Sequence, residues 1–526
     1  MILAGALVLV VIVALAQWFM PQVTTPAAPT TTTTQTAPAK PDPPALGDKS
    51  IAVLPFANLS PDKEDAFFAD GLTEEILNAL AQIRGIRVIS RTSSFAFKGR
   101  QTPLPEIAKQ LAVRHVLEGS VRRDGKNVRV TAQLIDVQSD AHMWSQTFER
   151  KTEDVFVVQD EITRAIANAL DVELEFSSDP GGAPTESIEA YRSFLEGREL
   201  FRLRRGRQDI VNSIALYKRA IALDAKFAEA YSALAQSYNA LITRGTLELK
   251  TLGPLVEEAA ATAIKLKPTL AQPYAALSTL KRFQLDWEGA LTTASKASTL
   301  DHSDSLTLLN LGFLQLTAGY VEQSSHTLDE ALRSDPLYAY IQVGVMVAAF
   351  ARADDSTCVR VATRVVQSGA DFAVSGEGFL AYYARSEGNS ANAEKHFRGW
   401  VDKSPAWPSS IVEPVIAALK SSTAVQSAVK AINKERARDP SLAPIPLLIV
   451  GAQDDLVDAV SSELSRGNTA RVAIYVPYLW RFVTTNKEMS PRHKALMRDV
   501  GLVDYWKKHG WPDRCHPKGK DDFECS

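Results

Sequence analysis

The sequence predicts a transmembrane helix, then a small α/β domain, then an all-α superhelix built from helix pairs. Three observations lead to this fold class: an apolar run near the start, alternating strand and helix patterns over residues 49–175, and a 34-residue period from residue 186. With 526 residues, 45% of them hydrophobic and 23% charged, the chain has the composition of a globular protein of several domains. A net charge of −3 gives no electrostatic reason to expect nucleic acid as a partner.

The apolar run predicts a transmembrane helix over residues 1–20. As a helix it would be about 29 Å long, close to the thickness of about 30 Å of a bilayer's hydrocarbon core. Trp18 and Phe19 would lie at the interface. We therefore expect a single-pass inner-membrane protein with most of the chain in the periplasm. The alternative is a cleaved signal and a secreted periplasmic chain, since Ala14 and Ala16 form an A-x-A site, although no Lys or Arg precedes the run.

A stalk is predicted over residues 21–48. The stretch PQVTTPAAPTTTTTQTAPAKPDPP is dominated by Pro and Thr and has almost no apolar surface to bury. Such a segment stays disordered and partly polyproline-like. It would separate the anchor from the folded part of the chain.

The α/β domain is predicted over residues 49–175. SIAVLPFANL has the short apolar composition of a buried strand, and apolar residues then recur at helical spacing up to Ile83. Residues 86–98 return to strand composition, and residues 103–113 form a second helix. Asp124-Gly125 is a hairpin dipeptide between two alternating strands, and a third helix ends the domain.

A repeat array is predicted over residues 186–406. Leu277 and Leu311 are 34 positions apart, as are Asp301 and Asp335. This is the period of tetratricopeptide repeats, in which two helices form each unit and neighbouring units bury a shared core. We expect about six repeats, two of them degenerate.

The last region, residues 407–526, is predicted to be helical with interruptions, continuing the stack and closing it with an irregular cap. Its most apolar stretch is AIYVPYLWRFV, residues 473–483. Periodicity does not decide whether this stretch is a strand or a helix.

Acidic residues gather where the first predicted strand leads into the first helix. They are Asp62, Asp65, Asp70, Glu74 and Glu75. Adjacent Glu side chains on a helix point about 100° apart, so they do not converge as an acid–base pair. Acidic residues in a first turn also stabilise the helix dipole. We therefore predict a structural role, no enzymatic activity and no cofactor.

The chain's end carries His509, Cys515, His516 and Cys525. Four such side chains could bind zinc, but a disulfide between Cys515 and Cys525 is favoured for a chain outside the cytoplasm, and no metal is predicted. The third cysteine, Cys358, occupies a small-residue position of a repeat and is predicted to be a buried thiol.

A binding groove is predicted on the concave side of the repeats. In repeat register the residues facing it are Gln236, Asn239, Thr279, Arg282 and Phe313. A polar and aromatic groove suits an extended peptide or the tail of a partner protein. The alternative is that these side chains only solvate the inner wall.

Several segments resemble a known family. IAVLPFANLSPDKEDAFFADGLTEEILNAL, VISRTSSFAFKG and HVLEGSVRRDGKNVRVTAQLID are similar to the TolB-like amino-terminal domain that precedes tetratricopeptide repeats in many bacterial proteins. SPRHKALMRDVGLVDYWKKHGWPDRCHPKGKDDFECS resembles the closing, "end-of-group" segment of such arrays. The resemblance implies an α/β domain followed by a repeat superhelix.

Two functions follow from this organisation. The first is a membrane-tethered, extracytoplasmic scaffold or sensor module that binds proteins without catalysis. Members of the resembled group are often fused to an adenylate cyclase or a winged-helix regulator, and this sequence contains neither. The second hypothesis is therefore the sensory half of a truncated signalling protein whose effector domain lies upstream.

Overall fold

The structure is a computed structural model. It describes residues 49–61, 65–81, 83, 85–125, 127–151, 155–172, 184–203, 207–243, 249–301, 304–369, 372–404, 406–486, 488–519 and 522–525. The chain divides into two compact units, Met1–Ala45 and Leu46–Ser526, and all of these residues belong to the second. The predicted anchor and stalk lie outside the described residues.

The predicted membrane helix needs correction. No helix within the ranges given above is long and apolar enough to cross a membrane. The longest of them, α9 (Leu249–Leu266) and α22 (Thr469–Asn486), have 18 residues each and carry charged side chains such as Glu257 and Arg481. This finding corrects the predicted fold class with an N-terminal transmembrane helix and the predicted inner-membrane location, and the described residues give no support for the membrane as a partner. The fold class is an α/β domain joined to a helical array.

The α/β domain contains a mixed sheet with the strand order β3-β1-β4-β5-β6, in which β2 also pairs with β4. β1 pairs in parallel with β3 and β4, whereas β4, β5 and β6 form an antiparallel meander. Gly125, with a φ of +58°, forms the β4–β5 turn at the predicted hairpin dipeptide. The strands are β1 (Ser50–Val53), β2 (Ala57–Asn58), β3 (Arg87–Val88), β4 (His115–Asp124), β5 (Asn127–Asp136) and β6 (Ala141–Lys151).

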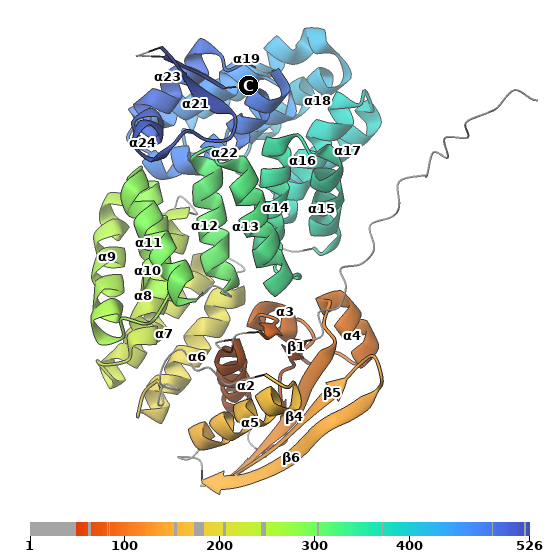
Figure 1. Cartoon of the computed structure of the whole chain (residues 1–526). Helices are drawn as coiled ribbons and strands as arrows, with labels where there is room; N and C mark the ends of the chain where they lie inside the picture. The colour runs from red at the N-terminus through yellow and green to blue at the C-terminus, as the bar shows by residue number, and fades with distance from the viewer. Residues whose placement is uncertain are drawn as a thin grey trace, which may run out of the picture. The chain divides into compact units, whose positions relative to one another are not determined.

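Helices cover this sheet unequally. α2 (Asp65–Ala81) and α5 (Val155–Ala169) pack on one face, where Ile76, Ile162 and the inward side chains of β4 and β5 form the core (Figure 1). The short helices α3 (Arg91–Phe95) and α4 (Leu104–Leu111) cover the other face only beside β1. The predicted strand over residues 86–98 is thus mostly wrong, because pairing ends at Val88 and a helix begins at Arg91.

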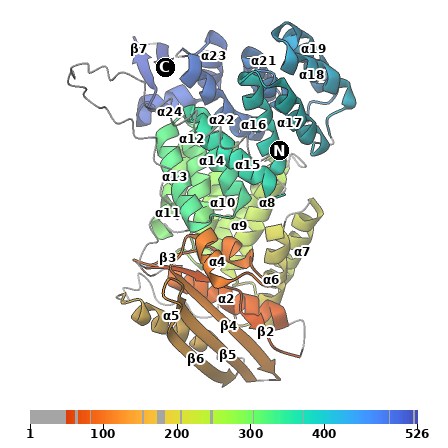
Figure 2. The same cartoon turned by 90° about the vertical axis from the view of Figure 1, so that its right-hand side faces the viewer.

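The helical array consists of antiparallel helix pairs that stack side by side, and this repeated arrangement fits tetratricopeptide repeats (Figures 1 and 2). Their turns contain residues in the left-handed backbone conformation at intervals of about 34 residues: Leu285, Gly319, Ala353 and Gly388. The pairs within residues 186–406 are α6 (Ile188–Leu203) with α7 (Arg207–Leu223), α8 (Ala228–Thr243) with α9, α10 (Gln272–Phe283) with α11 (Trp287–Leu300), α12 (Ser305–Thr317) with α13 (Val321–Ser334), α14 (Ala339–Arg352) with α15 (Asp355–Gln367), and α16 (Ala373–Ser386) with α17 (Ser390–Asp402).

The C-terminal region continues the stack and then returns to it. Residues 473–483, ambiguous in the sequence, belong to helix α22, which packs against α8, α10, α12 and α14. The region is therefore more than a cap on the last repeat. Its other elements are η2 (Ser409–Ile411), α18 (Val412–Lys420), η3 (Ser422–Ala424), α19 (Val425–Arg438), α20 (Ile445–Ile449), α21 (Gln453–Ser465), α23 (Pro491–Asp499), α24 (Leu502–His509), β7 (Cys515–Lys518) and β8 (Asp522–Cys525).

Candidate functional site

The residues predicted to line a groove belong to the inner face of the array, which helices α8, α10, α12 and α14 form. Helix α22 of the same chain lies on this face. Arg282 and Phe313 come together, with the guanidinium carbon 6.0 Å from the Phe313 ring centre. Arg282 is buried, whereas Phe313 is partly exposed. Of the two side chains, Phe313 is therefore the more accessible to a partner.

Arg282 is engaged with α22 through a carbonyl that a proline leaves free. In a regular helix the Ala473 carbonyl accepts from the N–H of residue 477, but residue 477 is Pro477 and has no N–H. Arg282 Nη1 lies 3.3 Å from this oxygen and donates to it, whereas the Thr317 hydroxyl, 3.5 Å away, donates mainly to the Phe313 carbonyl at 2.7 Å. The inner face therefore supplies a donor that the helix lacks, and burial lowers the pKa of Arg282.

The other three predicted groove residues have mainly internal roles. Asn239 is buried, and its Nδ2 donates to the Ala276 carbonyl at 2.8 Å, which links α8 to α10. Thr279 donates to the Ala275 carbonyl of its own helix at 3.1 Å. Gln236 is partly buried. Peptide binding through these residues stays a prediction.

A row of aromatic side chains extends from Phe313 along the inner face. Phe313 lies 5.6 Å from Tyr340, and Tyr340 stacks on Phe372 with ring centres 5.1 Å apart. All three rings are partly exposed. The sequence reasoning missed Tyr340 and Phe372, because they occupy different repeat positions and meet only across neighbouring helix pairs.

Further contacts attach α22 to the array along its length. Arg481 forms an ion pair with Asp355 of α15, and Thr484 Oγ1 donates to the Ala351 carbonyl at 2.8 Å. Tyr478 stacks on Phe379 of α16 with ring centres 5.9 Å apart. The inner face is thus occupied by a mostly buried helix of the chain itself.

The acidic residues near α2 make a junction between the α/β domain and the array. Glu74 pairs with Arg91 of α3 and with Arg198 of α6, and Glu75 accepts from the Tyr191 hydroxyl of α6 at 3.2 Å. Burial raises the pKa of Glu75 to about 7, against the opposing effect of Arg198.

The rest of this acidic group is also paired, within the α/β domain. Asp65 pairs with Arg123 and Asp70 with Lys98. Burial raises the pKa of Asp70, although Lys98 opposes this effect. Asp62 lies outside the described residues. Asp65, Asp70 and Glu74 thus form ion pairs, and Glu75 accepts a hydrogen bond from Tyr191.

A second junction joins α3 to the turn between α13 and α14. The Ser90 N–H donates to the Ser334 carbonyl at 2.8 Å, and the Ser93 hydroxyl donates to Asp335 while accepting from the Leu337 N–H. Leu337 also packs against the apolar cluster beneath α3 and α4. Burial raises the pKa of Asp335 to about 6. The α/β domain therefore contacts the array at two places far apart in sequence.

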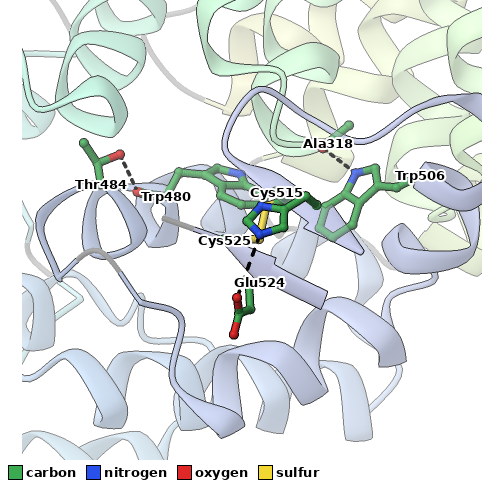
Figure 3. The surroundings of a disulfide bond; sticks show 8 residues. Ala318, Trp480, Thr484, Trp506, Cys515, Glu524 and Cys525 are labelled. Carbon is green, nitrogen blue, oxygen red and sulfur yellow. Dashed lines mark hydrogen bonds and ion pairs between the residues drawn. A yellow bond between two sulfur atoms is a disulfide. The ribbon is translucent and has the colours of Figure 1, made fainter. Parts of the chain in front are cut away.

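The chain's end is closed by a disulfide between Cys515 and Cys525 (Figure 3). His516 Nε2 lies 3.8 Å from a Glu524 carboxylate oxygen. Across the described part of the chain, no group of three His, Cys, Asp or Glu side chains is placed to hold a metal ion. Cys358 is a buried free thiol, and burial raises its pKa to about 12.

The α/β domain is similar to parts of known proteins. Residues 47–165 match the family described as HilA/YgeH-like transcriptional regulator, second domain. A protein of Rhizobium meliloti (strain 1021), named "Putative adenylate cyclase 3", is 48% identical over 136 residues. The match covers 26% of this chain and 23% of that protein.

Among solved structures, the crystal structure of yeast Tom70 aligns over 64% of this chain and 70% of that chain. The alignment has 14% identity and a TM-score of 0.33, which is too low to support an inference about fold or function.

Proposed function

We propose that this chain is a protein-interaction scaffold in which the helical array binds a peptide segment of a partner and the α/β domain is fixed to the array's side. The observation that carries the proposal is the inner face itself. It already holds a helix of this chain through side-chain donors and stacked rings. Such a face suits the recognition of amphipathic segments.

The proposed contact surface is the partly exposed row of Phe313, Tyr340 and Phe372 beside α22. Aromatic side chains offer a large contact area at a low cost in conformational entropy, and they often dominate binding energies. Arg282 supports the row from beneath Phe313. Gln236 and Thr279 extend the surface along the inner face, whereas Asn239 serves to hold α8 and α10 together.

Photocrosslinking tests this proposal. A photoreactive benzoylphenylalanine at position 340 is expected to form a covalent adduct with a partner protein in cells, and Phe313→Ala is expected to reduce the adduct at least threefold. The same photoreactive residue at Lys296, exposed on the outer helix α11, is the matched control. Equal labelling from positions 340 and 296 would count against the inner face as the binding surface.

The sequence resemblance supports a TolB-like assignment for residues 49–175, and the HilA/YgeH-like match covers much of the same stretch. We infer that this domain is a regulatory module used with different effectors. The names of the matched family and of the matched protein suggest that their other domains are a transcriptional regulator in one case and an adenylate cyclase in the other.

A second candidate function follows from that inference: the sensory half of a signalling protein. The 48% identity to part of a named adenylate cyclase favours it. Sequencing the DNA upstream of Met1 tests it. An in-frame cyclase or winged-helix region supports this function, and an in-frame stop codon without such a region contradicts it.

A further inference from the structure

Strand β6 forms an open edge of the sheet. It has 11 residues and pairs with β5 alone among the described strands. Phe148 is the one β6 side chain that is buried. Figures 1 and 2 both place β6 at the outer side of the α/β domain. A strand edge of this length presents unpaired backbone N–H and C=O groups to another strand.

The middle of this edge lacks the residues that usually prevent pairing. Proteins protect open edges with charged side chains, proline or bulges that point the strand away. The pairing of β6 with β5 has an irregularity at Met143, and after it, from Trp144 to Phe148, the sequence is WSQTF, with no Lys, Arg, Asp, Glu or Pro. The charged residues come afterwards and have partners in the same copy: Glu149 pairs with Arg129 of β5, and Arg150 with Glu161 of α5.

We propose that β6 pairs antiparallel with β6 of a second copy of this chain, around a two-fold axis at Gln146. In this register Trp144 of each copy lies opposite Phe148 of the other, on the face where these residues already oppose Leu134 and Val130 of β5. Aromatic cross-strand pairs stabilise antiparallel strands. Moving the axis by one residue places Trp144 opposite Arg150 or Gln146, so the aromatic pairing selects this register.

Exposed apolar side chains flank the same edge. Met143, at the irregular position of β6, is 41% exposed, and Val157 of α5 is 50% exposed. Glu161, one helical turn after Val157, reaches Arg150 of β6, so this side of α5 lies next to the edge. Pairing of two copies would bring both apolar side chains toward the interface.

The register makes a specific crosslink prediction. Directly opposite residues in an antiparallel pair have Cβ atoms about 5 Å apart, near the disulfide range, whereas diagonal neighbours are about 7–8 Å apart. Gln146→Cys should therefore form a disulfide-linked dimer on oxidation, because residue 146 lies opposite residue 146 of the second copy. Residue 147 lies opposite residue 145 and only diagonal to residue 147 of the second copy. Thr147→Cys should therefore give at least fivefold less disulfide-linked dimer. The natural cysteines do not interfere, because Cys515 and Cys525 are bonded and Cys358 is buried.

Light scattering of the purified full chain tests the association itself. The wild-type chain is expected to have twice its monomer mass at tens of micromolar, and Gln146→Lys, which places two like charges on the axis, is expected to be monomeric. Gln110→Lys on α4 is the matched control, since that residue is also exposed and its new charge would lie beside Glu106. A monomeric wild type, a dimeric Gln146→Lys chain, or equal crosslinking of both cysteine variants would each overturn the proposal.

Discussion

The contact of Arg282 with the Ala473 carbonyl can be tested by a double-mutant cycle with Pro477. Arg282→Met removes the donor and keeps most of the apolar stem. Pro477→Ala restores a backbone N–H at the position that normally satisfies the Ala473 carbonyl. If Arg282 acts through this carbonyl, the cost of Arg282→Met must be smaller in the Pro477→Ala chain than in the wild-type chain.

The magnitude follows from the geometry. A hydrogen bond from a charged donor contributes about 1.5–3 kcal/mol, and the distance of 3.3 Å from Arg282 Nη1 to the Ala473 oxygen argues for the lower end. The Thr317 hydroxyl, at 3.5 Å, compensates little when Arg282 is changed, because it donates mainly to the Phe313 carbonyl at 2.7 Å. We therefore expect a coupling of about 1 kcal/mol, which is a factor of about five in an equilibrium constant. Lost packing around each residue largely cancels in the cycle.

Hydrogen exchange of the α22 amides is the suitable assay, because it reports local opening in a chain of several domains. Arg282→Met is expected to speed exchange in residues 469–486 about tenfold in the wild-type chain and less than threefold in the Pro477→Ala chain. Equal acceleration in both chains would refute the reasoning, since it would show that Arg282 stabilises α22 independently of the carbonyl left free by proline.

Three further predictions concern the junction, the repeats and the chain's end. Burial raises the pKa of Glu75 from 4.5 to about 7. The contribution of Glu75 to stability is therefore present below about pH 4.5 and is lost as the pH rises through about 7, a loss of at most about 3 kcal/mol. Glu75→Gln should remove this loss, as measured by melting temperatures from pH 4 to 8. Ala353 has a φ of +62°, so Ala353→Gly should raise stability by about 0.5–1 kcal/mol in the same assay, and an unchanged or lower melting temperature would contradict the strain argument. Replacing Cys515 and Cys525 by Ser opens a loop with a sequence separation of 10. The change should destabilise the terminal hairpin by about 3 kcal/mol and speed limited proteolysis after residue 510. An unchanged rate of proteolysis would show that packing alone holds the hairpin.

The repeat period was predictable because the same local packing problem recurs in every unit. At Gly312 a Cβ atom would lie 2.6 Å from Leu328 Cγ, so α12 and α13 can approach only where the side chain is absent. The left-handed residues Leu285 and Ala353 recur at the turns for a similar geometric reason, although the sequence shows no glycine there. Constraints that repeat along the chain leave a period, and a period can be found without a structure.

The location of α22 was not predictable for the opposite reason. The run AIYVPYLWRFV is apolar on all sides because the helix is buried between the array and α21, so it has no periodicity of one face. Pro477 even argues against a helix. The donor for the carbonyl that Pro477 leaves free is Arg282, nearly 200 residues earlier, and a dependence across that distance leaves no local pattern.

The acidic residues of α2 show how a group predicted to be structural from the sequence contacts other elements of the fold. Glu74 and Glu75 are neighbours in sequence and point about 100° apart, which is why they cannot act together on one substrate. Glu74 pairs with Arg91 of α3 and Arg198 of α6, and Glu75 accepts from Tyr191 of α6, so one turn of α2 contacts both helices. A close approach is needed as well, since a Cβ at Gly71 would lie 2.8 Å from Leu195 of α6. Charges buried at such a contact must be paired in every folded molecule, and the residues that most resemble an active site in the sequence are therefore those that fix the α/β domain to the array.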